Sequence, residues 1–252
     1  MSNNTSFSQR LAAQSGQLKI GIIGAMDEEV ELLSQTLEGC QEHTIAGYTL
    51  FTGTMHDVDV VLLKSGIGKV NAAIGTTLML QEFEPTCVIN TGSAGGFAED
   101  LNVGDVVIST EVRHHDVDVT IFGYEPGQVP GLPAGFTPDN FLADVAERCI
   151  ARMEGIKTVQ GLIATGDSFM NCPERVAKAR ENFPSMKAVE MEAAAIAQTC
   201  HQFDIPFIVI RALSDIAGKE SNLSFEQFLV VAAKHSAEMV MAIVQTISDE
   251  AA

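Results

Sequence analysis

The pattern of apolar and polar positions along the chain predicts an α/β protein. Short apolar runs rich in Val and Ile, which favour strands, alternate with longer stretches whose apolar residues recur at helical spacing. Strands are predicted at residues 18–25, 48–52, 58–64, 86–91, 105–110, 158–164 and 206–212. Helices are predicted at residues 27–37, 68–83, 138–153, 173–182, 192–202 and 224–247. This alternation predicts a single domain with a mixed, largely parallel central sheet flanked by helices.

The length and composition are those of one folded domain. A chain of 252 residues, 46% of them hydrophobic, can bury a sizeable core, and we expect that domain to span residues 18–252. Residues 1–17 are polar and rich in Ser, Asn and Gln, so we expect a disordered N-terminal extension. That segment lacks the apolar run of a secretory signal, and no other stretch approaches the roughly 20 apolar residues of a membrane span. No membrane association is therefore expected.

The charge balance and the cysteines narrow the classes of partner and compartment. The chain has 33 acidic residues against 15 Lys and Arg, a formal net charge of −18. A nucleic-acid partner is not expected, because binding a phosphate backbone requires a basic face. The five cysteines are odd in number and show no C-x-x-C spacing, so we predict reduced thiols and a cytoplasmic location.

Carboxylates stand where two buried elements begin or end. The apolar run 207–210 follows Pro206 and predicts a buried parallel strand whose carboxyl end carries Ser214 and Asp215. Glu192 opens an alanine-rich helix, where its carboxylate either caps the helix or belongs to a binding site. Because ligands of open α/β sheets bind at the carboxyl ends of the strands, this placement predicts a functional site.

The segment after the first strand does not fit a phosphate-binding loop. It has neither the G-x-G-x-x-G spacing of a dinucleotide fold nor a Walker motif, and three consecutive acids ending at Glu29 would repel phosphate. Acids in a first helical turn also complement the helix dipole, so either that role or the holding of a water molecule remains open. Glycine loops at residues 65–69 and 91–96 allow close approach of a ligand to the backbone, or simply turn the chain.

Metal chemistry and acyl transfer are not favoured. His114 and His115 are adjacent, so their side chains would point to opposite sides of a strand, and no H-E-x-x-H spacing occurs. Ser93 lies in T-G-S-A-G-G, which is not the G-x-S-x-G motif of a nucleophilic serine. We therefore expect no metal and no cofactor.

From about residue 19 to residue 247 the chain resembles the bacterial 5′-methylthioadenosine/S-adenosylhomocysteine nucleosidases of the nucleoside phosphorylase-like superfamily. The resemblance rests on ordered blocks: K-I-G-I-I-G-A-M-D-E-E-V, L-L-K-S-G-I-G-K-V, I-N-T-G-S-A-G-G, H-D-V-D-V-T-I-F-G-Y, V-E-M-E-A and R-A-L-S-D. One departure is Asp27, where the family usually has Glu.

This resemblance implies hydrolysis of the N-glycosidic bond of methylthioadenosine and S-adenosylhomocysteine, and of 5′-deoxyadenosine, within methionine salvage and the recycling of S-adenosylmethionine by-products. Asp215 would protonate N7 of adenine, with Ser214 orienting it, and Glu29 would deprotonate the attacking water. The resemblance also implies a substrate-binding set composed of Ile67, Ser93, Phe169, Met170, Met191, Glu192, Arg211 and Ser214. Among these, Met191 and Glu192 would bind the ribose, Phe169 would stack on adenine, and Ile67 would contact the alkylthio group.

Members of this family are homodimers, which implies that Val119, Phe122 and Pro130 reach the thio pocket of the partner subunit. Two alternatives stay open. A purine nucleoside phosphorylase would use phosphate, with Arg211 as its contact, but the acidic loop at Glu29 and the absence of Arg from residues 91–96 disfavour it. A noncatalytic nucleoside sensor would lack an acid or a base, whereas Glu29 and Asp215 are both present.

Overall fold

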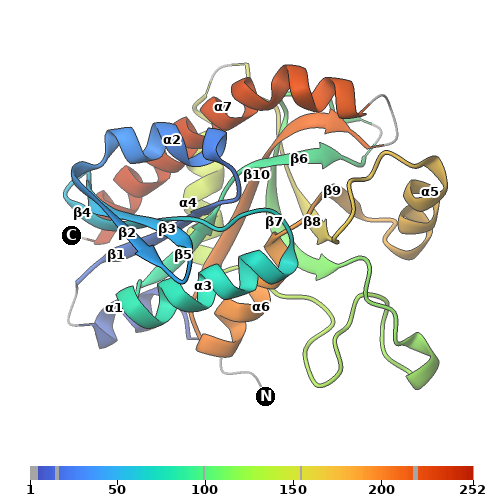
Figure 1. Ribbon diagram of the computed structural model, residues 1–252, viewed down its shortest axis with the longest axis horizontal. Helices are drawn as coiled ribbons and strands as arrows, with labels where there is room; N and C mark the ends of the chain where they lie inside the picture. Colours follow the sequence, from blue (N-terminus) through green and yellow to red (C-terminus); the bar gives the residue numbers. More distant parts are fainter. Residues whose placement is uncertain (1–4, 15–16, 99, 154, 218–220, 252) are drawn as a thin grey trace.

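The computed structural model describes residues 5–14, 17–98, 100–153, 155–217 and 221–251. Its centre is a ten-stranded sheet in the order β2-β3-β4-β1-β5-β10-β6-β9-β8-β7 (Figure 1). The strands are β1 (Lys19–Gly24), β2 (Glu38–Ile45), β3 (Tyr48–Met55), β4 (Val58–Lys64), β5 (Cys87–Asn90), β6 (Ser93–Gly96), β7 (Val106–His114), β8 (Thr158–Thr165), β9 (Met186–Glu190) and β10 (Phe207–Ile216). The helices are α1 (Phe7–Ala13), α2 (Asp27–Thr36), α3 (Lys69–Phe83), α4 (Asn140–Ile150), α5 (Pro173–Asn182), α6 (Ala193–Phe203) and α7 (Ser221–Ala251), with a 3₁₀ turn at Thr120–Phe122.

Strand β10 joins the two halves of the sheet. It pairs in parallel with β5 through its first residues and with β6 through its last, and it also pairs antiparallel with β7. The order β10-β6-β9-β8-β7 therefore returns to β10 and closes the second half of the sheet on itself. Because β10 is buried along nearly its whole length, its first residues, 207–210, form a continuous apolar run instead of an alternating pattern. The predicted mixed, largely parallel sheet is confirmed.

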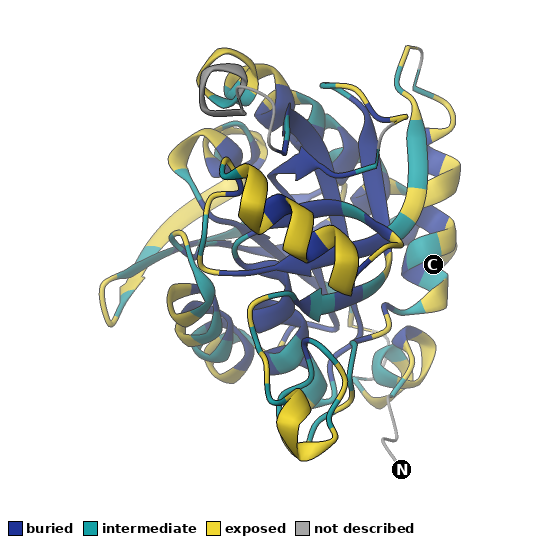
Figure 2. Ribbon diagram, turned by 90° about the vertical axis from the view of Figure 1, so that its right-hand side faces the viewer, coloured by how far each residue is buried: buried dark blue, intermediate teal, exposed yellow. Residues whose placement is uncertain are grey.

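Helices cover both faces of the sheet. One core combines side chains of α2, α4 and α7 with one face of the strands, and a second combines α3 and α6 with the other face. A smaller core lies between α5 and the strands β8 and β9. Figure 2 shows burial running through the strands and exposure on the loops and outer helix faces. This layering leaves the carboxyl ends of the parallel strands as the accessible edge of the sheet.

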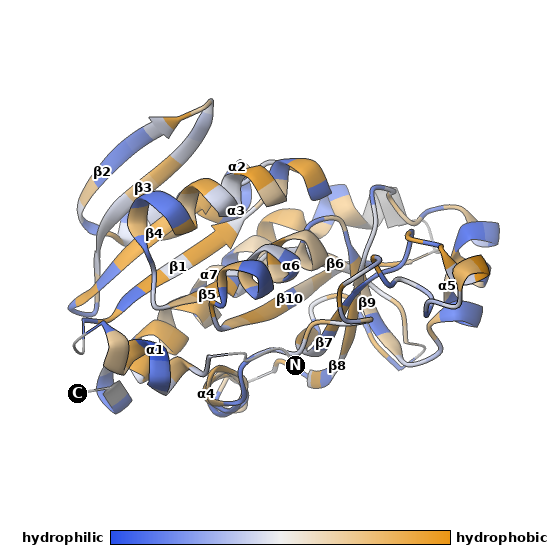
Figure 3. Ribbon diagram, turned by 90° about the horizontal axis from the view of Figure 1, so that it is seen from below, coloured by the Kyte–Doolittle hydropathy of each residue, from blue (hydrophilic) through white to orange (hydrophobic). Residues whose placement is uncertain are grey.

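Three strands were not predicted from the sequence, and each lacks the usual strand pattern. Strand β2 is largely exposed and forms a hairpin with β3 that extends beyond the helices (Figure 3). Strand β6 has the sequence S-A-G-G, which carries no β-branched residue, and β9 is only five residues long. Tertiary pairing therefore decides these strands, not local preference.

The N-terminal segment is not disordered throughout, so that expectation is wrong for the helix α1. Ser6 and Gln9 form a capping box at its start, and the buried side chain of Phe7 stacks on Phe141 at a centroid distance of 4.8 Å. The only large apolar side chains of this helix are those of Phe7 and Leu11. The composition of the segment does not reveal that the rest of the fold offers a surface against which they pack. Residues 1–4 and 15–16 of the predicted disordered extension lie outside the described residues.

Within the described residues, one segment, Phe225–Glu250 of α7, is long and apolar enough by length and composition to cross a membrane. A core helix of a folded domain passes the same test. Helix α7 packs against β10, α2 and α4, and the side chains of Met239, Val240 and Ile243 are fully buried in that contact. Its apolar composition is thus accounted for by the core, and the absence of a membrane association stays a prediction.

Candidate active site

A cavity of about 290 Å³ opens at the carboxyl ends of β1, β4, β8, β9 and β10. Parallel strands bring residues that are far apart in the sequence to this edge, as the strand order requires. Eight residues from the sequence-derived set line the cavity: Glu29, Ile67, Ser93, Phe169, Met191, Glu192, Ser214 and Asp215. The structure therefore brings together most of the predicted site.

Glu29 is buried at the first turn of α2 and is held by four hydrogen bonds. Its Oε2 accepts from the backbone N–H groups of Ala25 at 2.7 Å and Met26 at 3.3 Å. Its Oε1 accepts from the backbone N–H and the hydroxyl of Ser93, both at 3.0 Å. These bonds join the loop after β1 to the start of β6 and fix the carboxylate at the cavity wall. The side chain of Glu29 therefore does more than complement the dipole of α2.

Gly92 leaves room for the side chains of both Glu29 and Arg211, which pack against it. Its φ of 143° lies in a region that side chains rarely adopt. A methyl group on this residue would lie 2.5 Å from Arg211 Nη1 and 2.7 Å from Glu29 Oε1. The glycine loop 91–96 thus serves close packing of charged side chains around a site, not only a turn.

Asp215 lies near the end of β10, buried beside Gly95 of β6, with its side chain at the cavity wall. Burial raises the pKa of this carboxyl from its ordinary 3.8 to about 6, against the opposing effect of the Ser214 hydroxyl. Ser214 donates to Asp215 Oδ1 at 3.0 Å. A carboxyl group with this pKa keeps an appreciable protonated fraction near neutral pH and can serve as an acid.

Glu192 precedes α6 but does not cap it. The side chain makes no hydrogen bond to its own helix, and its Oε1 instead accepts from the N–H of Gly68 at 2.9 Å, at the start of α3. Burial, together with the nearby Glu190, raises the pKa of Glu192 against the lowering effect of Arg211. The helix-capping alternative for Glu192 is therefore wrong, and its carboxylate faces the cavity.

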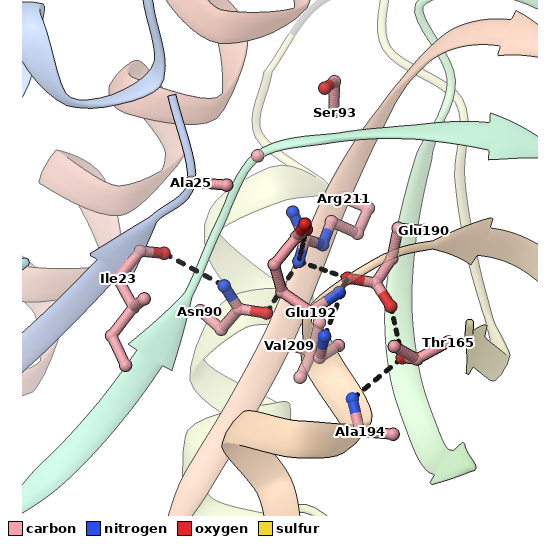
Figure 4. A network of polar contacts seen from close by, with 12 residues as sticks. Ile23, Ala25, Asn90, Ser93, Thr165, Glu190, Glu192, Ala194, Val209 and Arg211 are labelled. Atoms are coloured by element: carbon pink, nitrogen blue, oxygen red, sulfur yellow. Dashed lines mark hydrogen bonds and ion pairs between the residues drawn. The ribbon is translucent and has the colours of Figure 1, made fainter. Parts of the chain in front are cut away.

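Arg211 lies behind the cavity and does not line it. Its Nη2 forms an ion pair of 2.6 Å with Glu190 Oε2 and donates to Asn90 Oδ1 at 2.8 Å, while Glu192 Oε2 lies 3.7 Å away (Figure 4). The guanidinium is buried, with 1% of its side chain exposed. The carboxylate that pairs most closely with this charge is that of Glu190.

Aromatic and apolar side chains form the rest of the cavity. Phe169 follows β8 and is partly exposed, and its ring meets that of Phe225 edge to face at a centroid distance of 5.8 Å. Ile67 lines the cavity and is half exposed, so its apolar side chain is accessible to a ligand. Met170 is buried beside Phe169 and lines a small side cavity of about 30 Å³ instead of the main one.

The three residues that were expected to reach the thio pocket of the partner subunit do not line the main cavity of their own chain. Phe122 is 78% exposed, Pro130 is exposed and Val119 is half-buried, all on the segment between β7 and α4. Among the described residues, no group of three or more His, Cys, Asp or Glu side chains is arranged to hold a metal ion. The expectation that the protein needs no metal or cofactor stays a prediction.

Seven residues that line the cavity were not in the predicted set, and Glu190 and Phe225 are two of them. Glu190 stands two positions before Glu192 in the block V-E-M-E-A, and its place in this block was the available signal, because β9 itself was not predicted as a strand. Phe225 comes from α7, the last element of the chain, and no local motif marked it. Helical periodicity assigns such a residue to the core, and only the packing of α7 over β10 brings it to the cavity.

The fold and the cavity define a class. A mixed sheet with helices on both faces carries, at the carboxyl ends of its strands, a cavity that combines two aromatic rings with four buried carboxyl groups. The family model of the phosphorylase superfamily matches residues 19–245, so the chain belongs to that superfamily.

Relatives narrow the family. A 5′-methylthioadenosine/S-adenosylhomocysteine nucleosidase of Geobacillus kaustophilus is 60% identical over 92% of this chain and 99% of its own length. The crystal structure of such a nucleosidase from Colwellia psychrerythraea in complex with adenine has a TM-score of 0.89 at 52% identity, covering 90% of this chain and 95% of that one. The Streptococcus pneumoniae nucleosidase with the transition-state inhibitor MT-ImmA has a TM-score of 0.87 at 42% identity, covering 90% and 99%. The chain belongs to the 5′-methylthioadenosine/S-adenosylhomocysteine nucleosidase family.

Proposed function

We propose that the protein hydrolyses the N-glycosidic bond of 5′-methylthioadenosine and S-adenosylhomocysteine. Water attacks C1′ of the ribose, the bond from C1′ to N9 breaks, and its electron pair leaves with the base. Asp215 supplies a proton to N7 of the departing adenine, and Glu29 accepts a proton from the attacking water. The products are adenine and the 5-thio-substituted ribose.

One observation carries this proposal: two buried carboxyl groups, those of Asp215 and Glu29, line the same cavity in different surroundings. Burial gives Asp215 a raised pKa of about 6, which suits a proton donor. Glu29 instead accepts four hydrogen bonds at its two oxygens, which hold its carboxylate in one orientation at the cavity wall. An acid from strand β10 and a base from helix α2 match the use of two carboxyl groups in glycoside hydrolysis.

The remaining wall residues suit the other parts of a thionucleoside. Glu192 would accept hydrogen bonds from the ribose hydroxyls and stabilise the positive charge that develops on the sugar, with Met191 packed against it. Phe169 and Phe225 present ring faces and edges to adenine. Ile67 offers an apolar contact to the 5′-alkylthio group. Together these contacts would place the glycosidic bond between the acid and the base.

The phosphorylase alternative is not favoured. Within the part of the chain that the structure describes, the cavity wall contains four carboxylates and no Lys or Arg. The nearby guanidinium of Arg211 is already paired with Glu190. A phosphate ion would therefore enter a field of negative charge, whereas a neutral water molecule would not.

Adenine release distinguishes these reactions. The purified protein is incubated with methylthioadenosine or S-adenosylhomocysteine in phosphate-free buffer and again with added phosphate, with inosine as the control substrate. Release of adenine at the same rate in both buffers supports hydrolysis. Release that requires phosphate and yields ribose 1-phosphate would refute it, and tight binding without products would indicate a sensor.

We propose further that the working form is a homodimer. Phe122 and its neighbour Ile121 are 78% and 87% exposed, and α3 presents an additional exposed apolar side chain at Val70. Large exposed apolar groups on one loop and one helix are typical of an interface. Light scattering should give twice the mass of the chain, and Phe122→Asp should give a monomer with weakened turnover; a monomeric parent protein would contradict the proposal.

A cytoplasmic location is also proposed. All five cysteines are unpaired, and the thiols of Cys87 and Cys200 are fully buried. Free buried thiols suit a reducing compartment. Cell fractionation with an antibody against the protein tests this, and recovery from a secreted fraction would contradict it.

A further inference from the structure

Glu190 is a buried carboxylate that the proposed reaction does not use. It stands at the end of β9, and its Oε2 accepts from Arg211 Nη2 at 2.6 Å, from the N–H of Glu192 at 2.9 Å and from that of Ala193 at 2.8 Å. Its Oε1 accepts from the hydroxyl of Thr165 at the end of β8. Donors from three elements thus hold this side chain in one orientation (Figure 4).

These bonds give Glu190 the capping role that was one of the two alternatives considered for Glu192. The first N–H groups of a helix need partners from outside the helix. Glu190 satisfies those of Glu192 and Ala193, and the hydroxyl oxygen of Thr165 accepts from Ala194 at 2.8 Å. Because the start of α6 is satisfied in this way, the carboxylate of Glu192 is free to face the cavity.

The Glu190 carboxylate also holds the guanidinium of Arg211 through Nη2, whereas Glu29 lies on the side of Nη1. Glu190 and Asn90 hold Nη2, whereas Nη1 donates to the backbone oxygen of Thr91 at 3.3 Å and lies against Gly92, as Glu29 Oε1 also does. One guanidinium therefore lies among three carboxylates. Without Glu190, the charge of Arg211 would be free to move toward Glu192 or Glu29 and neutralise them.

We propose that Glu190 is a positioning residue: it holds Arg211 in place beside Glu29 and keeps the carboxylate of Glu192 available to the ribose. This inference rests on the proposed hydrolysis. Glu190 acts through its two neighbours and exchanges no proton with substrate or water. The alternative is that Glu190 and Arg211 form a buried ion pair that serves the fold alone, and such pairs are often replaceable.

The variant Glu190→Gln tests the proposal because it keeps the size of the side chain and removes the charge. We expect kcat for adenine release from methylthioadenosine to fall about 10- to 100-fold, as for a lost charge-assisted hydrogen bond, with KM changed less than about 3-fold. The matched control is Glu250→Gln, which breaks a surface pair of Arg148 with Glu250 far from the cavity. The control should retain the kcat of the unchanged protein.

Ligand binding separates positioning from a purely structural role. Glu190 acts on the ribose and water side, so Glu190→Gln should weaken MT-ImmA at least about 10-fold and change the affinity for adenine by less than about 3-fold. If Glu190→Gln does not fold, Thr165→Val removes one of its hydrogen bonds, keeps the charge, and should shift the same ratio in the same direction by a smaller factor.

Two results would overturn the inference: an unchanged kcat in Glu190→Gln, or an equal loss of affinity for adenine and MT-ImmA together with a lower Tm. A parent protein that releases no adenine would instead overturn the proposed function. The binding ratio needs no turnover, so the two failures are distinguishable.

Discussion

Replacing Asp215 by Asn should abolish most of the activity and yet stabilise the protein. Burial raises the pKa of this carboxyl from 3.8 to about 6. At pH 7 about one folded molecule in ten then carries the proton, against about one in 1,500 for an ordinary aspartate. Asn cannot donate this proton, so kcat should fall about 10²- to 10⁴-fold.

The gain in stability follows from the same raised pKa. Between pH 3.8 and about 6 the folded state binds more protons than the unfolded state, so this group's contribution to stability is lost as the pH rises. Relative to a neutral side chain, an ionisable Asp215 costs about 2 kcal/mol at pH 5 and about 3 kcal/mol at pH 8. Asn removes this cost, and its amide oxygen can still accept from Ser214.

Urea denaturation of both proteins at pH 5 and pH 8 measures this difference, and adenine release measures the activity. The advantage of Asp215→Asn in the free energy of unfolding should be larger at pH 8, by about 1 kcal/mol. An advantage of equal size at both pH values, or a loss at pH 8, would show that the carboxyl does not carry the cost of burial. The argument for Asp215 as the acid would then fail with it.

Three other substitutions test separate parts of the structure. Glu29→Gln should lower kcat about 10²- to 10⁴-fold while adenine binding, measured by calorimetry, persists; near-normal turnover would remove Glu29 from its role as base. Gly92→Ala should displace the side chains of Arg211 and Glu29 that pack against this residue, visible as lost turnover, and an active variant would contradict the close packing seen there. Phe7→Ala should cost about 3 kcal/mol in urea denaturation, because its ring is buried against Phe141; an unchanged midpoint would show that α1 adds no stability.

The sequence alone determined the order and type of most elements. Helix α5 has the predicted bounds, and α2, α3 and α6 differ by one residue at an end or at both ends, because helical periodicity and turn residues act over a few neighbouring positions. The apolar run after Pro206 likewise predicted the strand that carries Ser214 and Asp215. The motif blocks identified the candidate residues of the site, although their roles stay predictions.

Only the tertiary structure decided which of these residues lie together and how burial changes the pKa of their side chains. The pairing of β10 with β6 buries Asp215, and burial raises the pKa of this carboxyl. The end of β9 places Glu190 where its carboxylate, and not that of Glu192, accepts from the first N–H groups of α6. The docking of α1 and the arrival of Phe225 at the cavity were equally invisible in the sequence. Burial and long-range charge interactions depend on groups that are distant along the chain, and local sequence patterns contain no record of those distances.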